Sequence, residues 1–175
     1  YDCARGMEPL ITDTRARIST EGLSPLPSLE FFTTDLIHYI YRQRSLRPLV
    51  EPPQLHTFIL IEEAQTILER RVGSGIAFYQ EMLLRSRSLG LGFTFVTQSL
   101  SQIDPTVLAA CSNCFLFAQS SAEDKRAAQK ILDLSAREAG LLGDLQPGEC
   151  FIKLAGHPLW PHPFLARIPD VRTLS

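Results

Sequence analysis

Short runs of apolar residues alternate along the chain with segments in which apolar residues recur every three or four positions. The runs cover residues 58–61, 93–98, 114–118, 148–154 and 163–168. Runs of this length are typical of strands, and the sequence FILI at 58–61 has the pattern of a strand buried on both faces of a parallel sheet. The pattern therefore predicts five strands, of which we expect the last two to be neighbours.

The segments between these runs carry the periodicity and the start signals of helices. One helix is expected from Ser28, with basic residues gathered near its C-terminal end, and another after Gly75. Further helix starts are indicated by an N-cap followed by proline and by two capping-box patterns, at Asp104–Pro105, Ser121–Asp124 and Ser135–Glu138. Strands and helices that alternate at these spacings predict an α/β, three-layer fold with a mainly parallel sheet.

Composition narrows the class of protein. The chain has 175 residues, 45% of them hydrophobic, which suffices for about one domain with a packed core. A net charge of -2 and a pI near 6.1 argue against a broad basic face, so any contact with nucleic acid must be local. No apolar run approaches the roughly 20 residues of a membrane span, and the first ten residues lack the features of a signal peptide. We therefore expect a cytoplasmic protein with no membrane segment in this chain.

Four cysteines raise the question of a metal or redox site. The spacing C-x-x-C occurs once, at Cys111 and Cys114, but a zinc site needs a second pair or suitably spaced histidines. A redox pair is expected at the start of a helix, whereas this pair leads into an apolar run. We predict that Cys111, Cys114 and Cys150 are buried structural thiols, as is Cys3.

Polar residues follow two of the predicted strands. Glu62 and Glu63 come directly after the run 58–61, and Thr97 and Gln98 end the run 93–98. In an open parallel sheet, ligands bind beyond the carboxyl ends of the strands, so these four side chains should converge. One carboxylate can hold Mg²⁺, directly or through water, while its neighbour activates a water that attacks a phosphate. The alternative is two solvated acids beside a polar strand end.

Two segments of the sequence resemble a known family. TFILIEEAQ resembles a Walker B strand, and RSRSLGLGFTFVTQSLSQIDPTVLAACSNCFLF resembles the arginine, glycine, strand and Thr-Gln segment that follows it in the HerA/FtsK superfamily of hexameric P-loop motors. The resemblance runs from about Ser28 to Val171. It implies a RecA-like P-loop NTPase core, with residues 1–28 as a loop or peripheral segment and 29–175 as the C-terminal half of the ATPase domain.

The resemblance assigns roles residue by residue. Glu62 takes the position of the aspartate linked to Mg²⁺, and Glu63 takes that of the catalytic glutamate. Gln98 matches the sensor glutamine at the strand end, and Thr97 precedes it in the nucleotide-binding Thr-Gln pair. Arg87 matches an arginine associated with the nucleotide of the neighbouring subunit. Glu62 departs from the family, because its extra methylene changes the reach to the metal shell.

An arginine at a helix end can also be a solvated residue without a functional role. This alternative applies to Arg87 and to its neighbour Arg85.

One family motif is absent from the sequence. The loop G-x-x-x-x-G-K-[ST], whose backbone amides and lysine hold the triphosphate, does not occur, and Gly73-Ser74-Gly75 is too short to replace it. Because that loop would lie before the first strand of the fold, we expect the chain to be the C-terminal half of an ATPase domain, either as a fragment or as a chain whose partner half is separate. Alone it should be inactive and should bind nucleotide weakly.

The implied function is that of an ATP-driven motor. The resemblance implies that the intact protein is a homo-hexameric DNA translocase or helicase, which hydrolyses ATP with Mg²⁺ and passes DNA through its pore. A conjugation or type IV secretion ATPase is an alternative within the motor class, and a nuclease or a secretion system is a possible partner. The alternative outside that class is a degenerate, non-hydrolysing module that only builds or docks onto a ring.

Overall fold

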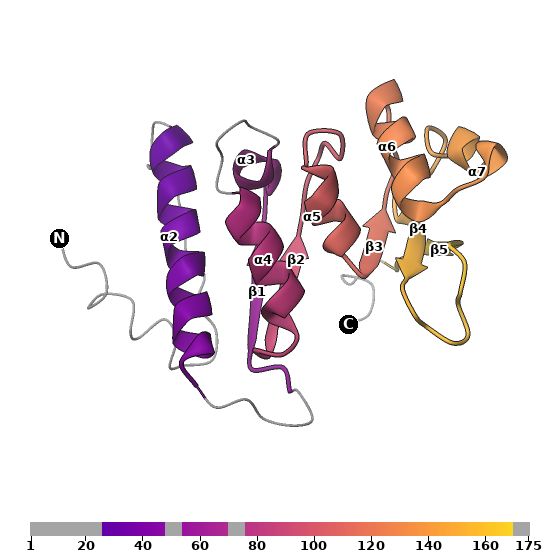
Figure 1. Cartoon of the computed structure of the whole chain (residues 1–175). Coiled ribbons are helices and arrows are strands. Elements are labelled where there is room, and N and C mark those ends of the chain that lie inside the picture. Colours follow the sequence, from indigo (N-terminus) through magenta and orange to yellow (C-terminus); the bar gives the residue numbers. More distant parts are fainter. Residues whose placement is uncertain (1–25, 48–53, 70–75, 170–175) are drawn as a thin grey trace. The chain divides into compact units, whose positions relative to one another are not determined.

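The computed structural model describes residues 26–47, 54–69 and 76–169, with the backbone alone described at 26–29, 76 and 77 (Figure 1). These residues form two compact units. The first unit comprises 26–47, 54–69 and 77–97, and the second comprises Ile76 with 98–169. Each unit is described by itself. None of the described helices is long and apolar enough to cross a membrane.

The first unit contains a pair of parallel strands. Its elements are α2 (Leu26–Ser45), β1 (Thr57–Ile61), α3 (Gln65–Leu68), α4 (Ile76–Ser86) and β2 (Leu91–Phe95). β1 and β2 run parallel, in a register that places Thr57 opposite Leu91 and Ile61 opposite Phe95. Parallel pairing therefore brings the carboxyl ends of both strands to the same edge. The expected strands at 58–61 and 93–98 are confirmed, although β2 begins earlier and ends at Phe95.

The helices α2 and α4 pack through aromatic and polar contacts. The hydroxyl groups of Tyr79 on α4 and Thr34 on α2 share a hydrogen bond of 2.8 Å. Phe78 meets the rings of His38 and Tyr41 edge to face, at centroid distances of 5.0 and 5.9 Å. Tyr79 and Met82 are fully buried, as the helical pattern after Gly75 predicts.

The prediction that the strand at 58–61 is buried on both faces is wrong for the described residues. Ile61 is buried, but the side chains of Phe58 and Leu60 are 59% and 55% exposed. Alternate side chains of a strand point to opposite faces, so one face of β1 packs inward while the other lies open. A continuous apolar run identifies a strand correctly, but its burial depends on what covers each face.

A tight turn leads from α4 into β2 through Gly90. This glycine has a φ of +66°, and a Cβ added there would lie 2.3 Å from the Gln54 carbonyl oxygen. The Gly90 carbonyl accepts hydrogen bonds from the amides of His56 and Thr57, at 2.8 and 3.1 Å. The turn therefore requires glycine, and it sets the start of β2 beside the start of β1.

The second unit combines helices with an antiparallel sheet. Its elements are α5 (Pro105–Ala110), β3 (Asn113–Leu116), α6 (Ala122–Leu132), α7 (Ala136–Leu141), β4 (Glu149–Leu154) and β5 (Phe164–Arg167). The sheet order is β3-β4-β5, so the last two predicted strands are neighbours as expected. The fold is therefore α/β, with parallel pairing between β1 and β2 and antiparallel pairing among the other three strands. The buried core of the unit consists of Leu100, Leu116, Ala128, Leu132, Leu134, Leu142 and Phe151.

The predicted helix starts differ in how completely they form. Asp104 caps α5 by accepting from the Thr106 amide at 2.8 Å, with proline at the first helical position. Ser135 and Glu138 form the full reciprocal capping box of α7. At α6, Ser121 accepts from the amides of the first turn, but Asp124 does not return the interaction. That capping-box prediction is therefore only half correct.

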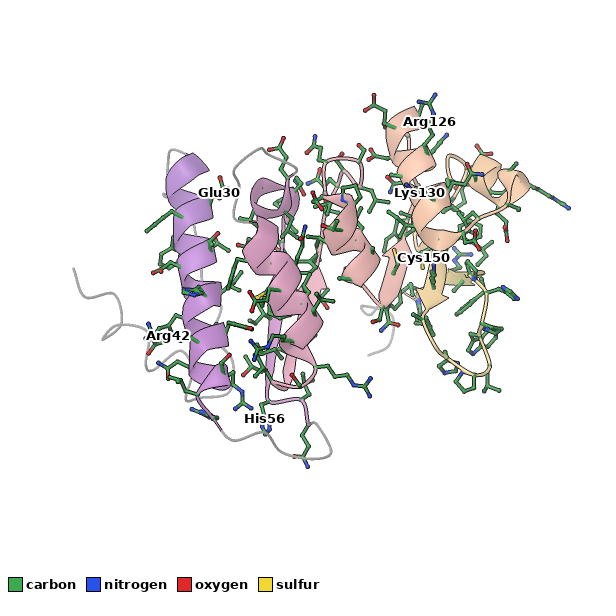
Figure 2. All side chains as sticks on the ribbon, in the orientation of Figure 1. Glu30, Arg42, His56, Arg126, Lys130 and Cys150 are labelled. Atoms are coloured by element: carbon green, nitrogen blue, oxygen red, sulfur yellow. The ribbon has the colours of Figure 1, made fainter. Side chains whose placement is uncertain are left out.

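The cysteines of the second unit are not uniformly buried, while Cys3 lies outside the described residues. Cys150 on β4 (Figure 2) is fully buried. Cys114 on β3 is partly buried and Cys111 at the end of α5 is exposed, which corrects the prediction for Cys111. Burial, with the nearby Cys111 as a smaller cause, raises the pKa of Cys114 to about 11. Thiols with raised pKa values are poor nucleophiles and poor metal ligands.

Candidate functional site

The chain turns sharply where β1 ends. Glu63 has a φ of +51°, a left-handed conformation that is uncommon for residues other than glycine. Hydrogen bonds on both sides fix this turn to the extension of β2: the Val96 amide donates to the Ile61 carbonyl at 2.8 Å, and the Ala64 amide donates to the Val96 carbonyl at 2.9 Å. Glu63 lies between the two residues that make these hydrogen bonds, and its exposed side chain is at the carboxyl edge of both strands.

A short buried helix holds the turn from the other side. Ala64 and Leu68 are fully buried and Ile67 is 5% exposed, so α3 is anchored in the core of the first unit. The Glu63 carbonyl accepts from both the amide and the hydroxyl of Thr66, at 3.0 and 2.9 Å. A left-handed conformation costs about 1–2 kcal/mol for such a residue and persists only where the surroundings enforce it, as these contacts do.

The Glu63 carboxylate is connected to the end of β2 through Gln65. The side-chain amide nitrogen of Gln65 donates to Glu63 Oε2 at 2.5 Å, and its oxygen accepts from the Thr97 hydroxyl at 2.7 Å. The structure thus brings Glu63 and Thr97 together, with Gln65 as the bridge. Sequence reasoning missed Gln65, although it stands two residues after Glu63 in EEAQ and a glutamine amide can donate and accept at once.

Glu62 differs from its neighbour in its surroundings. It is exposed, and within the described ranges its carboxylate makes no hydrogen bond or ion pair. A free carboxylate of this kind fits Mg²⁺, which binds through one or two carboxylates together with phosphate oxygens and water. No group of three or more His, Cys, Asp or Glu that could hold a metal by itself occurs among the described residues. Glu62 is therefore suited to a metal ion that arrives with phosphate.

Gln98 begins the segment 98–169 of the second unit and is exposed. The loop that it begins is held by Asp124 on α6, which is 7% exposed. Asp124 Oδ1 accepts from the Ser101 amide at 2.8 Å and from the Ser99 hydroxyl at 3.3 Å. Burial acts to raise the pKa of Asp124, but these hydrogen bonds outweigh it and hold the pKa below its ordinary value.

Arg87 lies away from the acids. It directly follows α4 and precedes β2, whereas Glu62 and Glu63 follow the other end of the parallel pair. Four residue steps separate Leu91 from Phe95, so these two edges are about 13 Å apart along the strand. The exposed Arg85 forms an ion pair of 3.6 Å with Glu81. Arg87 is exposed too, and it cannot reach the carboxyl edge of its own β1–β2 pair.

The α/β fold of this chain is also found in solved structures of other proteins. Those structures are RecA-like P-loop ATPases. No protein-family model and no curated protein matches the sequence.

Three solved structures illustrate the likeness. VirB4 of Thermoanaerobacter pseudethanolicus matches with a TM-score of 0.62 and 18% identity, over 85% of this chain and 39% of that one. The genome packaging NTPase B204 from Sulfolobus turreted icosahedral virus 2, in complex with ATP-gammaS, matches with a TM-score of 0.58 and 18% identity, over 80% and 62%. The bacterial conjugative coupling protein TrwB matches with a TM-score of 0.60 and 13% identity, over 82% and 38%.

These likenesses establish the fold. The neighbours are P-loop ATPases of the HerA/FtsK type, so the resemblance seen in the sequence extends to the three-dimensional structure. The chain spans 39% of the VirB4 structure and 62% of the B204 structure.

Proposed function

We propose that this chain is the C-terminal half of the ATPase domain of a HerA/FtsK-type motor, whose full-length protein hydrolyses ATP and passes DNA through a hexameric ring. The observation that carries the proposal is the strand-end site. There an exposed carboxylate, Glu62, stands beside a second carboxylate, Glu63, whose backbone and side chain are both held in place. The three-layer core expected from the sequence belongs to this proposal and would be completed by the phosphate-binding half.

Each side chain of the strand-end site has a different role in the proposed hydrolysis of ATP. Glu62 holds Mg²⁺, directly or through water, and Mg²⁺ when bound neutralises the charge of the phosphates. Glu63 accepts a proton from the attacking water, and Gln65 orients the Glu63 carboxylate for that step. Thr97 lies at the same edge as Glu63. Gln98, the next residue in the chain, carries an amide that would hydrogen-bond the water or a phosphate oxygen.

A second candidate function is favoured by the structural neighbours. VirB4 and the conjugative coupling protein TrwB match as closely as the packaging NTPase B204. The same ATPase site would then drive a conjugation or type IV secretion machine, with protein or a protein-bound DNA strand as the cargo. Both candidates share the chemistry at Glu62 and Glu63, and they differ only in what is moved.

The test of the ATPase site is Glu63→Gln in the full-length protein. Loss of the water-activating carboxylate should leave ATP bound and lower kcat by about two to four orders of magnitude. Glu62→Gln should instead weaken the dependence of the rate on Mg²⁺. Steady-state hydrolysis measures kcat and its dependence on Mg²⁺, and equilibrium binding of a fluorescent ATP analogue measures whether ATP stays bound.

Glu81→Gln is the matched control, because Glu81 is an exposed acid of the same unit that forms an ion pair with the surface residue Arg85. It should hydrolyse ATP at the wild-type rate. A Glu63→Gln protein with wild-type turnover would show that Glu63 is not the catalytic base. Absence of ATP hydrolysis in the wild-type protein would favour the ring-assembly alternative.

A further inference from the structure

The two sides of Gln98 are anchored to different parts of the chain. The preceding residue, Thr97, belongs to the first unit, and its hydroxyl is bound to Gln65 at 2.7 Å. The residues that follow belong to the second unit, where Leu100 is 8% exposed within the core and Ser101 is bound to Asp124. Gln98 therefore stands where the chain passes from one unit to the other, with a polar anchor on each side.

Asp124 does not make the hydrogen bond that its position in α6 would allow in a capping box. It is the third residue of α6, where a capping-box residue reaches back to the backbone of the N-cap. In α7 the equivalent residue, Glu138, does this, and its carboxylate accepts from the Ser135 amide at 2.8 Å. Asp124 instead turns its carboxylate to Ser99 and Ser101, more than 20 residues earlier in the chain.

The environment of Asp124 shows that this contact is a specific one. A carboxylate that is 7% exposed is costly to bury unless it is hydrogen-bonded. The hydrogen bonds from Ser99 and Ser101 end on the same oxygen, Oδ1, and both donors lie in the loop that begins with Gln98. Hydrogen bonds to an ionised acceptor are among the strongest that neutral donors make, so the loop is held tightly to the first turn of α6.

We propose that Asp124 is a positioning residue, which fixes the conformation of the loop that begins with Gln98, the residue that the proposed function assigns to the nucleotide. The catalytic part of this inference rests on the proposed ATPase function. Asp124 itself does not touch the nucleotide. It acts through Ser99 and Ser101, and the loop remains ordered only while an acceptor oxygen occupies the Oδ1 position.

The first test measures the loop directly by hydrogen–deuterium exchange in the full-length protein. Asp124→Ala removes the acceptor, so the Ser101 amide should exchange at least about tenfold faster than in the wild type. Asp124→Asn keeps an oxygen at the same place and should retain most of the protection. Glu123→Ala, the neighbouring acid in the first turn of α6, is exposed and should leave Ser101 unchanged. Unchanged exchange in Asp124→Ala would overturn the proposal, whatever the enzymatic activity.

The second test asks whether Asp124 acts through Gln98. Asp124→Ala should lower kcat by about ten- to a hundredfold and leave KM within a few-fold, since misplacing a group by about 1 Å has effects of this size. Asp124→Asn should recover most of the rate. In a Gln98→Ala background the additional loss from Asp124→Ala should fall below about twofold, because two residues that act as one unit are not additive.

The outcomes separate this inference from the proposed function. If Glu63→Gln stops hydrolysis while Asp124→Ala keeps its kcat, the ATPase assignment stands and the positioning role is wrong. Fully additive losses from Asp124→Ala and Gln98→Ala would likewise overturn it. Should Asp124→Ala fail to fold, Asp124→Ser replaces it, because a serine hydroxyl keeps a polar group at this helix position but is one bond too short to reach Ser101.

Discussion

At the scale of single residues, the side-chain contacts and the backbone conformation of position 63 favour different amino acids. The Glu63 carboxylate accepts a hydrogen bond from Gln65 of α3, while the Glu63 backbone is in a left-handed conformation that disfavours any residue with a Cβ. Glycine would relieve the backbone but would remove the carboxylate. Backbone strain at the residue that the proposed function makes the catalytic base is the pattern expected where stability is lost in favour of activity.

This strain predicts an order of stability between two variants. Glu63→Gly and Glu63→Ala both lack the carboxylate and its contact with Gln65, but only alanine keeps a Cβ at a φ of +51°. The glycine variant should therefore have the larger free energy of unfolding, by about 1 kcal/mol. Urea unfolding of both proteins measures the difference. An alanine variant as stable as the glycine variant would mean that the turn relaxes and stores no strain.

At the scale of secondary-structure elements, local signals predicted well where the interacting groups are close in sequence. The N-cap Asp104 bonds to Thr106 two residues later, and Ser135 bonds to Glu138 three residues later, so each motif contains both of its partners. Patterns of this kind need no knowledge of the rest of the fold. The capping motifs located the helix starts of α5 and α7, and the short apolar runs located the strands.

Three features of the same scale could not be predicted because their causes lie elsewhere in the chain. The carboxylate of Asp124 bonds to a loop 23 residues away rather than to its own helix. Phe58 is exposed although it lies in an apolar strand, since burial depends on the layer that covers it. Gln65 lies in α3, a helix of four residues that is too short to show helical periodicity, and its partner Thr97 is 32 residues away.

The raised pKa of Cys114 leads to a prediction about the reactivity of the C-x-x-C pair between α5 and β3. Burial, together with the nearby Cys111, raises the pKa of the Cys114 thiol to about 11, so at pH 8 only about one thousandth of it is thiolate. Iodoacetamide should therefore modify Cys114 in the folded protein far more slowly than in urea, with a rate that rises up to about pH 11. Mass spectrometry of timed digests measures this rate. Fast labelling at pH 8, or a Cys111–Cys114 disulfide under mild oxidation, would indicate a reactive pair.

At the scale of the whole molecule, the β1–β2 pair separates the candidate groups into two edges. Glu62, Glu63 and Thr97 lie at the carboxyl ends of the strands, whereas Arg87 lies at the opposite ends. A guanidinium held there cannot serve the acids of its own pair, so a catalytic role for Arg87 requires a nucleotide presented by a neighbouring subunit. Arg85 is a useful contrast, because it is also exposed but is paired with Glu81.

We therefore predict that Arg87 acts across a subunit boundary in the full-length protein. Arg87→Ala should leave nucleotide affinity within a few-fold and lower hydrolysis by as much as about 10³- to 10⁵-fold, the range measured for such arginines in other nucleotide hydrolases. Arg85→Ala, the matched control, should retain wild-type hydrolysis, because its exposed ion pair contributes little.

Mixing subunits tests the direction of this effect. An Arg87→Ala subunit keeps Glu63, and a Glu63→Gln subunit keeps Arg87, so a mixed ring contains interfaces at which an intact glutamate meets an intact arginine. Hydrolysis should reappear when the two inactive proteins are assembled together and should vary with their ratio. Mixed rings that assemble normally but remain inactive at every ratio would contradict a role in trans. Arg87 would then be a solvated residue at the end of α4, which its exposure alone also allows.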